Sequence, residues 1–254
     1  MTEAAPALPE GWALVSQPFE SEFFAAPVLQ LRIGGDGLDR LESTAAEVAA
    51  WAGRTGAGLV MARVPPAEER IAAALTAAGF ALVETLVTLE CPAPEQAIYP
   101  ATVRAGGAEE VAECAAIARE AFVFDRYHAD RRIAGRIASD IKENWVRNAF
   151  AGRADRCFVA EDEGRVAGFL LTLKRDDALV IDLVAVGSGF RGRGVGRALV
   201  EAAKARSHEV GAARVRVGTQ AANHVSLGLY DAAGFVRRSE MLTFHWVPAK
   251  QGAA

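Results

Sequence analysis

The sequence has few of the features that mark extracellular, membrane or metal-dependent proteins. Its 254 residues include three cysteines, Cys91, Cys114 and Cys157, which are far apart in the chain. An odd number without ligand spacing predicts buried thiols in a reducing compartment and no metal. No apolar run approaches the length of a membrane helix, and the first residues do not resemble a signal peptide. These absences predict a cytoplasmic protein with no membrane partner.

An excess of basic charge is also absent. The formal net charge is −4, the pI is about 5.7, and no sustained basic face is visible. This balance argues against non-specific nucleic-acid binding, so we expect no nucleic-acid partner. A hydrophobic content of 51% is ample for a core, and the length suits two small domains or one large one.

The most informative segment joins a strand, a glycine-rich turn and a helix. Residues 179–186 form an apolar run typical of a buried strand, and apolar residues recur at helical spacing from Val195 onward. The start of a helix presents free backbone N–H groups and a partial positive charge, and glycines let an anion approach the backbone. We therefore expect a phosphate or pyrophosphate to bind the turn, which contains Arg191, Gly192, Arg193, Gly194, Val195, Gly196 and Arg197.

Two common phosphate-binding motifs do not fit this segment. Residues 187–192 match the dinucleotide fingerprint G-x-G-x-x-G, but the next strand ends in Gly218-Thr219-Gln220 without an acidic residue for a ribose. Too little chain remains for a doubly wound sheet. A Walker P-loop is excluded because Gly192-Arg193-Gly194 stands where Gly-Lys-Ser/Thr is required.

A third pattern fits over about fifty residues. Arg191-x-x-Gly194-x-Gly196 follows the strand, and Asn223 and then Tyr230-x-x-x-Gly234-Phe235 lie downstream. This set resembles the GNAT superfamily of acetyl-CoA-dependent N-acetyltransferases. The resemblance implies acetyl-CoA as co-substrate and backbone groups of a strand that grip its pantetheine arm. The cofactor-binding residues so implied outside the turn are Val184, Ala185, Val186, Asn223 and Tyr230.

The resemblance also implies a chemical role for Tyr230, as the general acid that protonates the leaving thiolate. A phenol suits this role because it stays protonated at pH 7. Tyr230 can also be a core aromatic, and Asn223 can simply be the N-cap of its helix. Alternation places Asp182 on one strand face with Val184 and Val186, where it could orient or deprotonate the amine. An ordinary hydrogen-bonded aspartate is the alternative.

The chain divides near three prolines between residues 92 and 100, which predict a linker. The segments 57–90 and 212–245 both have the pattern of a strand, a helix, Ala-Ala-Gly-Phe and a second strand, at equal spacing. The similarity is either an internal repeat or a chance match. We interpret residues 1–97 as a degenerate GNAT-like lobe and residues 98–254 as the catalytic domain. In the front copy, Glu68 and Leu75 replace Asn223 and Tyr230. We expect the front lobe to bind no acetyl-CoA and to bury Phe23, Phe24, Leu29 and Leu82.

Further motifs resemble the dTDP-fucosamine acetyltransferase group, whose members have two such lobes. They are Ser21-Glu-Phe-Phe-Ala25, Gly79-Phe80 with the strand after it, and Arg126-Tyr-His-Ala-Asp130 followed by Trp145. Family members often have glycine where Ala25 stands. The polar loop 125–132 is expected to line the acceptor pocket through Arg126, His128 and Asp130, or else to be a solvated charged loop. Lys142 and Arg147 are expected to be solvated, and Gly53 to end a helix over 38–52.

Together these observations predict an α/β (α+β), two-lobed GNAT fold around a mixed, splayed central sheet. We expect an N-acetyltransferase that acts on a small amine, preferably a nucleotide-linked amino sugar. The alternatives are a GNAT enzyme for another amine (a polyamine, an antibiotic or a protein N-terminus) and a non-catalytic acyl-CoA sensor. Asn223, Tyr230 and the intact turn speak against the sensor. A homodimer is compatible with the sequence.

Overall fold

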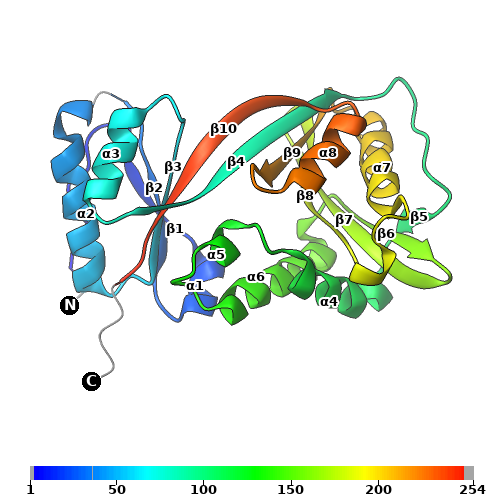
Figure 1. The fold of residues 1–254 in the computed structure, drawn as a ribbon, viewed down its shortest axis with the longest axis horizontal. Helices are drawn as coiled ribbons and strands as arrows, with labels where there is room; N and C mark the ends of the chain where they lie inside the picture. Colours follow the sequence, from blue (N-terminus) through cyan, green and yellow to red (C-terminus); the bar gives the residue numbers. More distant parts are fainter. Residues whose placement is uncertain (1–2, 36, 249–254) are drawn as a thin grey trace. The chain divides into compact units, whose positions relative to one another are not determined.

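The computed structural model describes residues 3–35 and 37–248. Within them, ten strands form one mixed hydrogen-bonded sheet in the order β1-β2-β3-β10-β4-β9-β8-β7-β6-β5 (Figure 1). The α/β class and the mixed sheet are therefore confirmed. The strands are β1 (Ala13–Ser16), β2 (Val28–Arg32), β3 (Leu59–Val64), β4 (Ala81–Pro92), β5 (Val103–Ala105), β6 (Arg156–Asp162), β7 (Arg165–Arg175), β8 (Ala178–Val186), β9 (Arg214–Gln220) and β10 (Val236–Trp246).

The helices connect these strands and include short 3₁₀ and π segments. None of the helices in the described part of the chain is long and apolar enough to cross a membrane. The α-helices are α1 (Pro18–Phe24), α2 (Leu41–Thr55), α3 (Glu69–Ala77), α4 (Val111–Ala121), α5 (Arg126–Ala129), α6 (Gly135–Asn148), α7 (Val195–Glu209) and α8 (His224–Ala232). The other helical segments are η1 (Gly37–Arg40), η2 (Ala108–Glu110), η3 (Ala149–Arg153) and η4 (Ser188–Phe190).

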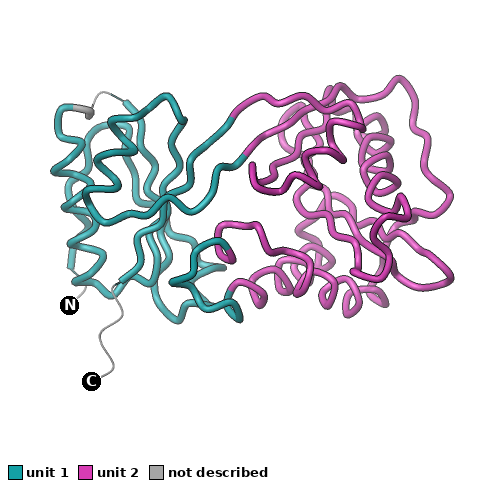
Figure 2. The backbone as a smooth tube through the Cα atoms, in the orientation of Figure 1, with its two compact units in different colours: residues 1–86, 129–137, 240–254 teal, residues 87–128, 138–239 magenta. Residues whose placement is uncertain are grey.

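The chain forms two compact units that are not continuous in sequence (Figure 2). Unit 1 comprises residues 1–86, 129–137 and 240–254, and unit 2 comprises residues 87–128 and 138–239. Strands β4 and β10 each contribute residues to both units. These units are defined by contacts, whereas the division that we predict after residue 97 follows chain order. As a domain boundary, that division stays a prediction.

The repeated segments have the same secondary structure. β3, α3 and β4 in the front copy correspond to β9, α8 and β10 in the rear copy. Their last strands, however, are exchanged: β3 pairs with β10, while β4 is the neighbour of β9. Leu242 to Trp246 run antiparallel to residues 60–64. Each copy thus completes its part of the sheet with a strand from the other copy.

The described residues of unit 1 form one hydrophobic core cluster. The apolar face of α2 packs with α3 and with β2 and β3, and the cluster includes Leu31, Val48, Leu75 and Phe80, all nearly inaccessible to solvent. Leu29 packs against this core, but Leu82 is exposed. The expectation that Leu82 packs inward is wrong, because the first residues of β4 alternate and Leu82 has its side chain on the solvent side.

In unit 2, buried core residues lie on both faces of strands β6–β8. One core cluster unites the sheet with α7 and α8 and includes Leu199, Val215 and Tyr230. A second cluster unites the opposite face of β6–β8 with α4 and the end of α6, and it includes Ala118 and Phe169. Near-continuous burial along β7 reflects these two layers, since a strand covered on both faces has no solvent side.

Two local expectations need correction. Helix α2 continues through Gly53 to Thr55, and Gly56 follows in the left-handed conformation, with φ of 72°. A left-handed glycine is the usual end of a helix, so Gly56 and not Gly53 is the stop signal. The polar segment 125–132 is not a simple loop, because residues 126–129 form the helical turn α5.

Candidate active site

The glycine-rich turn has the backbone geometry of an anion site. Gly192 and Gly194 have φ of 78° and 81°, a region that other L residues rarely adopt. Gly194 is the N-cap of α7 and offers no side-chain cap. The first N–H groups of this 15-residue helix therefore have no intrahelical acceptor. A Cβ added at either glycine would meet nothing within 4 Å, so the space in front of the turn is open.

Gly196 has a different role from the other two glycines. A Cβ at this position would lie 3.4 Å from Cδ2 of Leu229 and 3.7 Å from Cγ2 of Val186. The absent side chain thus allows α7 to pack closely against α8 and the end of β8. Close packing of α7 against α8 and β8, in addition to access for an anion, therefore explains why glycine stands at position 196.

The arginines of the turn are exposed, and they differ in their contacts. Nη1 of Arg193 lies 2.9 Å from Oδ2 of Asp162, and its guanidinium lies 5.8 Å from the ring centre of Phe190. No residue in the described part of the chain forms an ion pair with Arg191 or Arg197. The turn therefore carries cationic groups available to a phosphorylated ligand.

Strands β8 and β9 separate next to this turn. Their parallel register runs from Ala178 opposite Arg214 to Ile181 opposite Val217 and ends there. Among the described residues, the backbone of 182–186 has no strand partner on the β9 side. Free peptide groups on this edge can hydrogen-bond an extended ligand, as we expect for Val184, Ala185 and Val186.

A β-bulge at Asp182 accompanies this separation. The pairing of β7 with β8 shifts register between Leu171 and Thr172, which oppose Leu183 and Ile181. The extra residue changes which side chains share a face: Ile181 and Val184 both pack on the α7/α8 core. Leu183 packs in the other core. The alternation that grouped Asp182 with Val184 and Val186 is thus interrupted.

The Asp182 carboxylate forms an ion pair with Arg153, which follows α6. The guanidinium of Arg153 lies 5.5 Å from the ring centre of Trp145. Asp182 is half-buried, and it points toward the layer formed by α4 and α6. If Asp182 accepts a proton from the amine, it does so beside the positive charge of Arg153. An ordinary structural ion pair therefore explains Asp182 as well as a catalytic role does.

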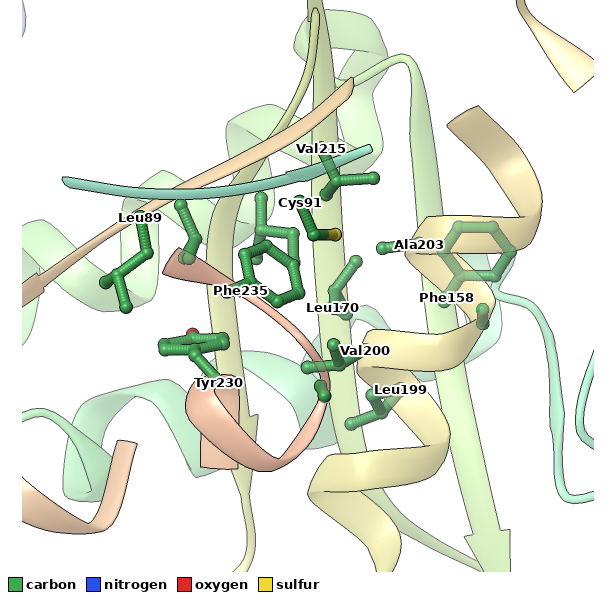
Figure 3. Packing of buried hydrophobic residues seen from close by; sticks show 14 of the residues in the cluster. Leu89, Cys91, Phe158, Leu170, Leu199, Val200, Ala203, Val215, Tyr230 and Phe235 are labelled. Carbon is green, nitrogen blue, oxygen red and sulfur yellow. The ribbon is translucent and has the colours of Figure 1, made fainter. Parts of the chain in front are cut away.

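Tyr230 and Asn223 lie on α8. The amide oxygen of Asn223 accepts a 3.1 Å hydrogen bond from the backbone N–H of Ser226, so Asn223 is the N-cap. Tyr230 is 2% exposed, and its ring centre lies 5.5 Å from that of Phe235 (Figure 3). Burial raises the pKa of Tyr230, which keeps the phenol protonated. No residue in the described ranges forms a hydrogen bond with its hydroxyl.

The three residues expected in the acceptor pocket have different surroundings. The guanidinium of Arg126 lies 4.4 Å from the ring centre of Tyr127 and donates to its hydroxyl at 2.7 Å. His128 is largely buried, with Nδ1 2.5 Å from Oδ2 of Asp125 and Nε2 3.4 Å from Oγ of Ser139. Their role toward an acceptor stays a prediction.

Asp130 is buried in unit 1 and is surrounded by donors. Its carboxylate accepts hydrogen bonds of 2.8 Å from Arg132 and lies 3.1 Å from Nδ1 of His245. Burial alone would raise the pKa of Asp130, but the hydrogen bonds from Arg132 and His245 lower it. These contacts tie residues 129–137 to β10, which is a structural role that the sequence pattern did not indicate.

Sequence reasoning also missed a buried charge cluster in unit 2. Lys142, expected to be solvated, is 5% exposed, and its Nζ lies 4.0 Å from Oδ1 of Asp125. The same Nζ lies 5.1 Å and 4.8 Å from the ring centres of Phe122 and Trp145. Buried lysines are rare unless they are paired with an acidic residue. Asp125, in the segment before α6, was therefore the feature of the sequence that could have indicated a buried Lys142. Arg147 is exposed as expected and pairs with Glu143.

Comparison with known families identifies this part of the chain. Residues 113–235 match the model of the acetyltransferase (GNAT) family. The match includes the glycine turn, both separated strands and helix α8. This segment is therefore similar to GNAT acetyltransferase domains. The match supports the enzyme class expected from the sequence, an acetyl-CoA-dependent N-acetyltransferase.

One curated relative is similar in sequence. The spore coat polysaccharide biosynthesis protein SpsD of Bacillus subtilis is 33% identical over 150 residues, which are 58% of this chain and 50% of that protein. The matched part of the chain thus spans about half the length of this relative.

Solved structures share the fold at low identity. A GCN5-related N-acetyltransferase from Sphaerobacter thermophilus has a TM-score of 0.65 at 15% identity, over 93% of this chain and 76% of the other. A protein of unknown function from Staphylococcus epidermidis has a TM-score of 0.66 at 11% identity, over 97% and 94%. A tandem GNAT protein from the clavulanic acid pathway has a TM-score of 0.57 at 15% identity, over 89% and 77%. These likenesses support the fold.

Proposed function

We propose that this GNAT domain transfers an acetyl group from acetyl-CoA to a primary amine of a small molecule, preferably a nucleotide-linked amino sugar. The observation that carries the first half of the proposal is the open glycine turn in front of α7. Gly192 and Gly194 leave room for an anion, the helix supplies unpaired N–H groups, and exposed arginines supply charge. We assign the pyrophosphate of acetyl-CoA to this turn.

The second part of the proposed cofactor site is the gap between β8 and β9. The backbone of Val184 and Val186 would hydrogen-bond the pantetheine arm and the acetyl carbonyl there. Acetyl-CoA would supply an activated thioester, and N–H donors near its carbonyl would stabilise negative charge that develops on oxygen during attack by the amine. The bulge at Asp182 supports this assignment, because it accompanies the separation of the strands.

We assign the role of general acid to Tyr230. Its hydroxyl proton is not held by an acceptor in the described part of the chain, and burial keeps the phenol protonated. The phenol would donate this proton to the sulfur as the C–S bond breaks, while Asn223 keeps the start of α8 in place through its cap. The amine would lose a proton to water or to Asp182, whose pairing with Arg153 makes it the weaker candidate.

The preference for an amino sugar depends on two resemblances. The motifs around Ser21, Gly79 and Arg126 resemble the dTDP-fucosamine acetyltransferase group. The curated relative is named for spore coat polysaccharide biosynthesis. Under this proposal Arg126 and His128 contact the acceptor. Asp130 would instead hold residues 129–137 in place through its contacts with Arg132 and His245. A cytoplasmic location and a homodimer remain predictions.

A thiol-release assay tests the proposal. Purified full-length protein is incubated with acetyl-CoA and a panel of amines that includes nucleotide-linked amino sugars, free amino sugars, polyamines, aminoglycosides and N-terminal peptides. We expect release of CoA above the hydrolysis background with nucleotide-linked amino sugars, and loss of this release in Tyr230→Phe. Turnover of another amine class alone would refute the acceptor assignment. Binding of acetyl-CoA without turnover of any amine would favour an acyl-CoA sensor.

A further inference from the structure

Three arginine side chains converge on one glutamate in unit 2. Glu90 on β4 is 13% exposed, and its Oε1 lies 2.6 Å from Nε of Arg216 and 3.5 Å from Nε of Arg214 on the neighbouring strand β9. Its Oε2 lies 3.6 Å from Nε of Arg238 on β10. Residues from three strands therefore form one cationic group, which we call the Glu90 cluster.

The Glu90 cluster lies on the sheet face opposite α7 and α8. Leu89 and Cys91, the neighbours of Glu90, pack in the core with these helices (Figure 3). Val215 on β9 belongs to the same core. Side chains alternate along a strand, so Glu90 and Arg216 point to the other face.

The cluster has more positive than negative charge. Among the described residues, Asp177 is the one acidic contact besides Glu90, at 2.7 Å from Nη2 of Arg214, so three guanidinium groups face two carboxylates. Arg238 is 58% exposed and makes no hydrogen bond to Glu90. Within the described residues, Nε is the only atom of Arg216 that is hydrogen-bonded. Its two terminal nitrogens keep their donors for another acceptor.

Strand register places the cluster near the separated part of the sheet. Arg216 lies directly opposite Val180 on β8, and the pairing of these strands ends one residue later. Asp182 follows Val180 by two positions, about 7 Å along a strand, and is directed toward the same side of the sheet. The cations therefore lie one strand away from the place where the acetyl group is proposed to bind.

We infer that the Glu90 cluster is an acceptor subsite that binds a phosphate or diphosphate group through Arg216 and Arg238. Glu90 accepts a hydrogen bond from Nε of Arg216, which leaves the terminal nitrogens of Arg216 available, and the exposed guanidinium of Arg238 lies beside the same carboxylate. A guanidinium presents paired donors that match phosphate oxygens, and two such groups suit a diphosphate better than a carboxylate. This inference rests on the proposed function. It assigns the binding of the diphosphate, which links the sugar to the nucleoside, to Arg216 and Arg238.

Direct binding tests the subsite without turnover. Full-length protein saturated with CoA, which occupies the glycine turn, is titrated with inorganic pyrophosphate in a calorimeter. We expect Arg216→Gln and Arg238→Gln each to weaken pyrophosphate binding by at least about tenfold, given the strength of charge-assisted hydrogen bonds. Arg237→Gln, on the opposite face of β10, is the matched control and should bind as wild type. Absent binding, or binding that neither substitution weakens, would overturn the inference.

Kinetics separate the subsite from the proposed function. With a diphosphate-linked amino sugar, Arg216→Gln should raise the KM of the acceptor at least about tenfold, while the KM of acetyl-CoA and of the free amino sugar stay within twofold. Arg216→Lys, which keeps the charge beside Glu90, should fold normally and show an intermediate KM. An unchanged KM would refute the subsite and leave the function standing. If pyrophosphate binding depends on these arginines but no amino sugar is acetylated, the acceptor assignment fails and the subsite stands.

Discussion

His128 donates a 2.5 Å hydrogen bond from Nδ1 to Oδ2 of Asp125, and both side chains are largely buried. An ionised carboxylate can only accept, so the imidazole proton is on Nδ1. Asp125 also lies 4.0 Å from Nζ of Lys142 and accepts a 3.0 Å hydrogen bond from the backbone of Tyr127. This carboxylate therefore fixes α5 to α6, where the acceptor is expected to bind.

Asp125→Asn should strongly destabilise the protein. The substitution removes the negative charge that lies beside the buried Lys142 ammonium, and breaking a buried ion pair typically costs about 3–5 kcal/mol. Urea unfolding at pH 7, followed by circular dichroism, measures the loss. Asp140→Asn on α6 is the control, because Asp140 pairs with the exposed Arg119 and should change the free energy of unfolding by less than about 1 kcal/mol. Equal effects of the two substitutions would contradict the buried-pair reading.

The destabilisation by Asp125→Asn should depend on pH. Burial alone would raise the pKa of Asp125, but Lys142 and His128 lower it below its ordinary value. A carboxyl whose folded pKa is depressed stabilises the fold above its unfolded pKa, near 4, and loses this contribution as the pH falls toward the folded pKa. The difference between wild type and Asp125→Asn should thus be full at pH 7 and shrink below about pH 4. A difference that is constant from pH 7 to pH 3 would contradict this account.

Acetyl-CoA should raise the melting temperature of the wild type, and Gly194→Asp should abolish the shift. Ligand that binds only the folded state stabilises it by mass action. The substitution places a carboxylate at a position with φ of 81°, in front of the start of α7. Gly211→Asp is a matched control, because Gly211 has φ of 64° and open space but follows the other end of α7. A shift that survives in Gly194→Asp would place the cofactor elsewhere.

Tyr230→Phe should lower kcat by about 10²–10⁴-fold, the range of general acid catalysis. The ring and its contact with Phe235 are kept, so the KM of acetyl-CoA and the melting temperature should change little. Steady-state thiol release measures both constants. Phe235→Leu disturbs the same packing without removing a proton donor, and it should reduce stability more than kcat. Turnover in Tyr230→Phe within a factor of a few of wild type would make Tyr230 a core residue.

A segment from Ala101 onward should be insoluble or inactive when expressed alone. It lacks β4, whose residues Val87, Leu89 and Cys91 belong to the core of unit 2, and β9 would lose its neighbour. Co-expression with residues 1–100 should restore acetyl transfer, because that fragment supplies the strand. Calorimetry of the intact chain should find one acetyl-CoA site, since the front copy has no glycine turn. Full activity and normal stability of the isolated segment would show that β4 is dispensable.

The sequence determined the features that depend on short spacing. The glycines before Val195 require positive φ, and Asn223 caps a helix three residues before its bonded N–H, so a local pattern was sufficient to place turn, cap and helix. The apolar run 179–186 gave the buried strand for the same reason. The motif as a whole indicated the resemblance to GNAT acetyltransferases, because its residues follow one another in chain order at fixed spacing.

Only the tertiary structure decided which distant groups meet. The sequences of β4 and β10 do not name their neighbours in the sheet, and only the strand order shows that these two strands are exchanged between the copies. The bulge at Asp182 shifts side chains between faces, which a strict period of two does not reveal. Lys142 is buried because Asp125 and two aromatic rings compensate its charge. The Glu90 cluster likewise joins β4 with β9 and β10, more than a hundred residues later in the chain, because long-range pairing brings its charges together.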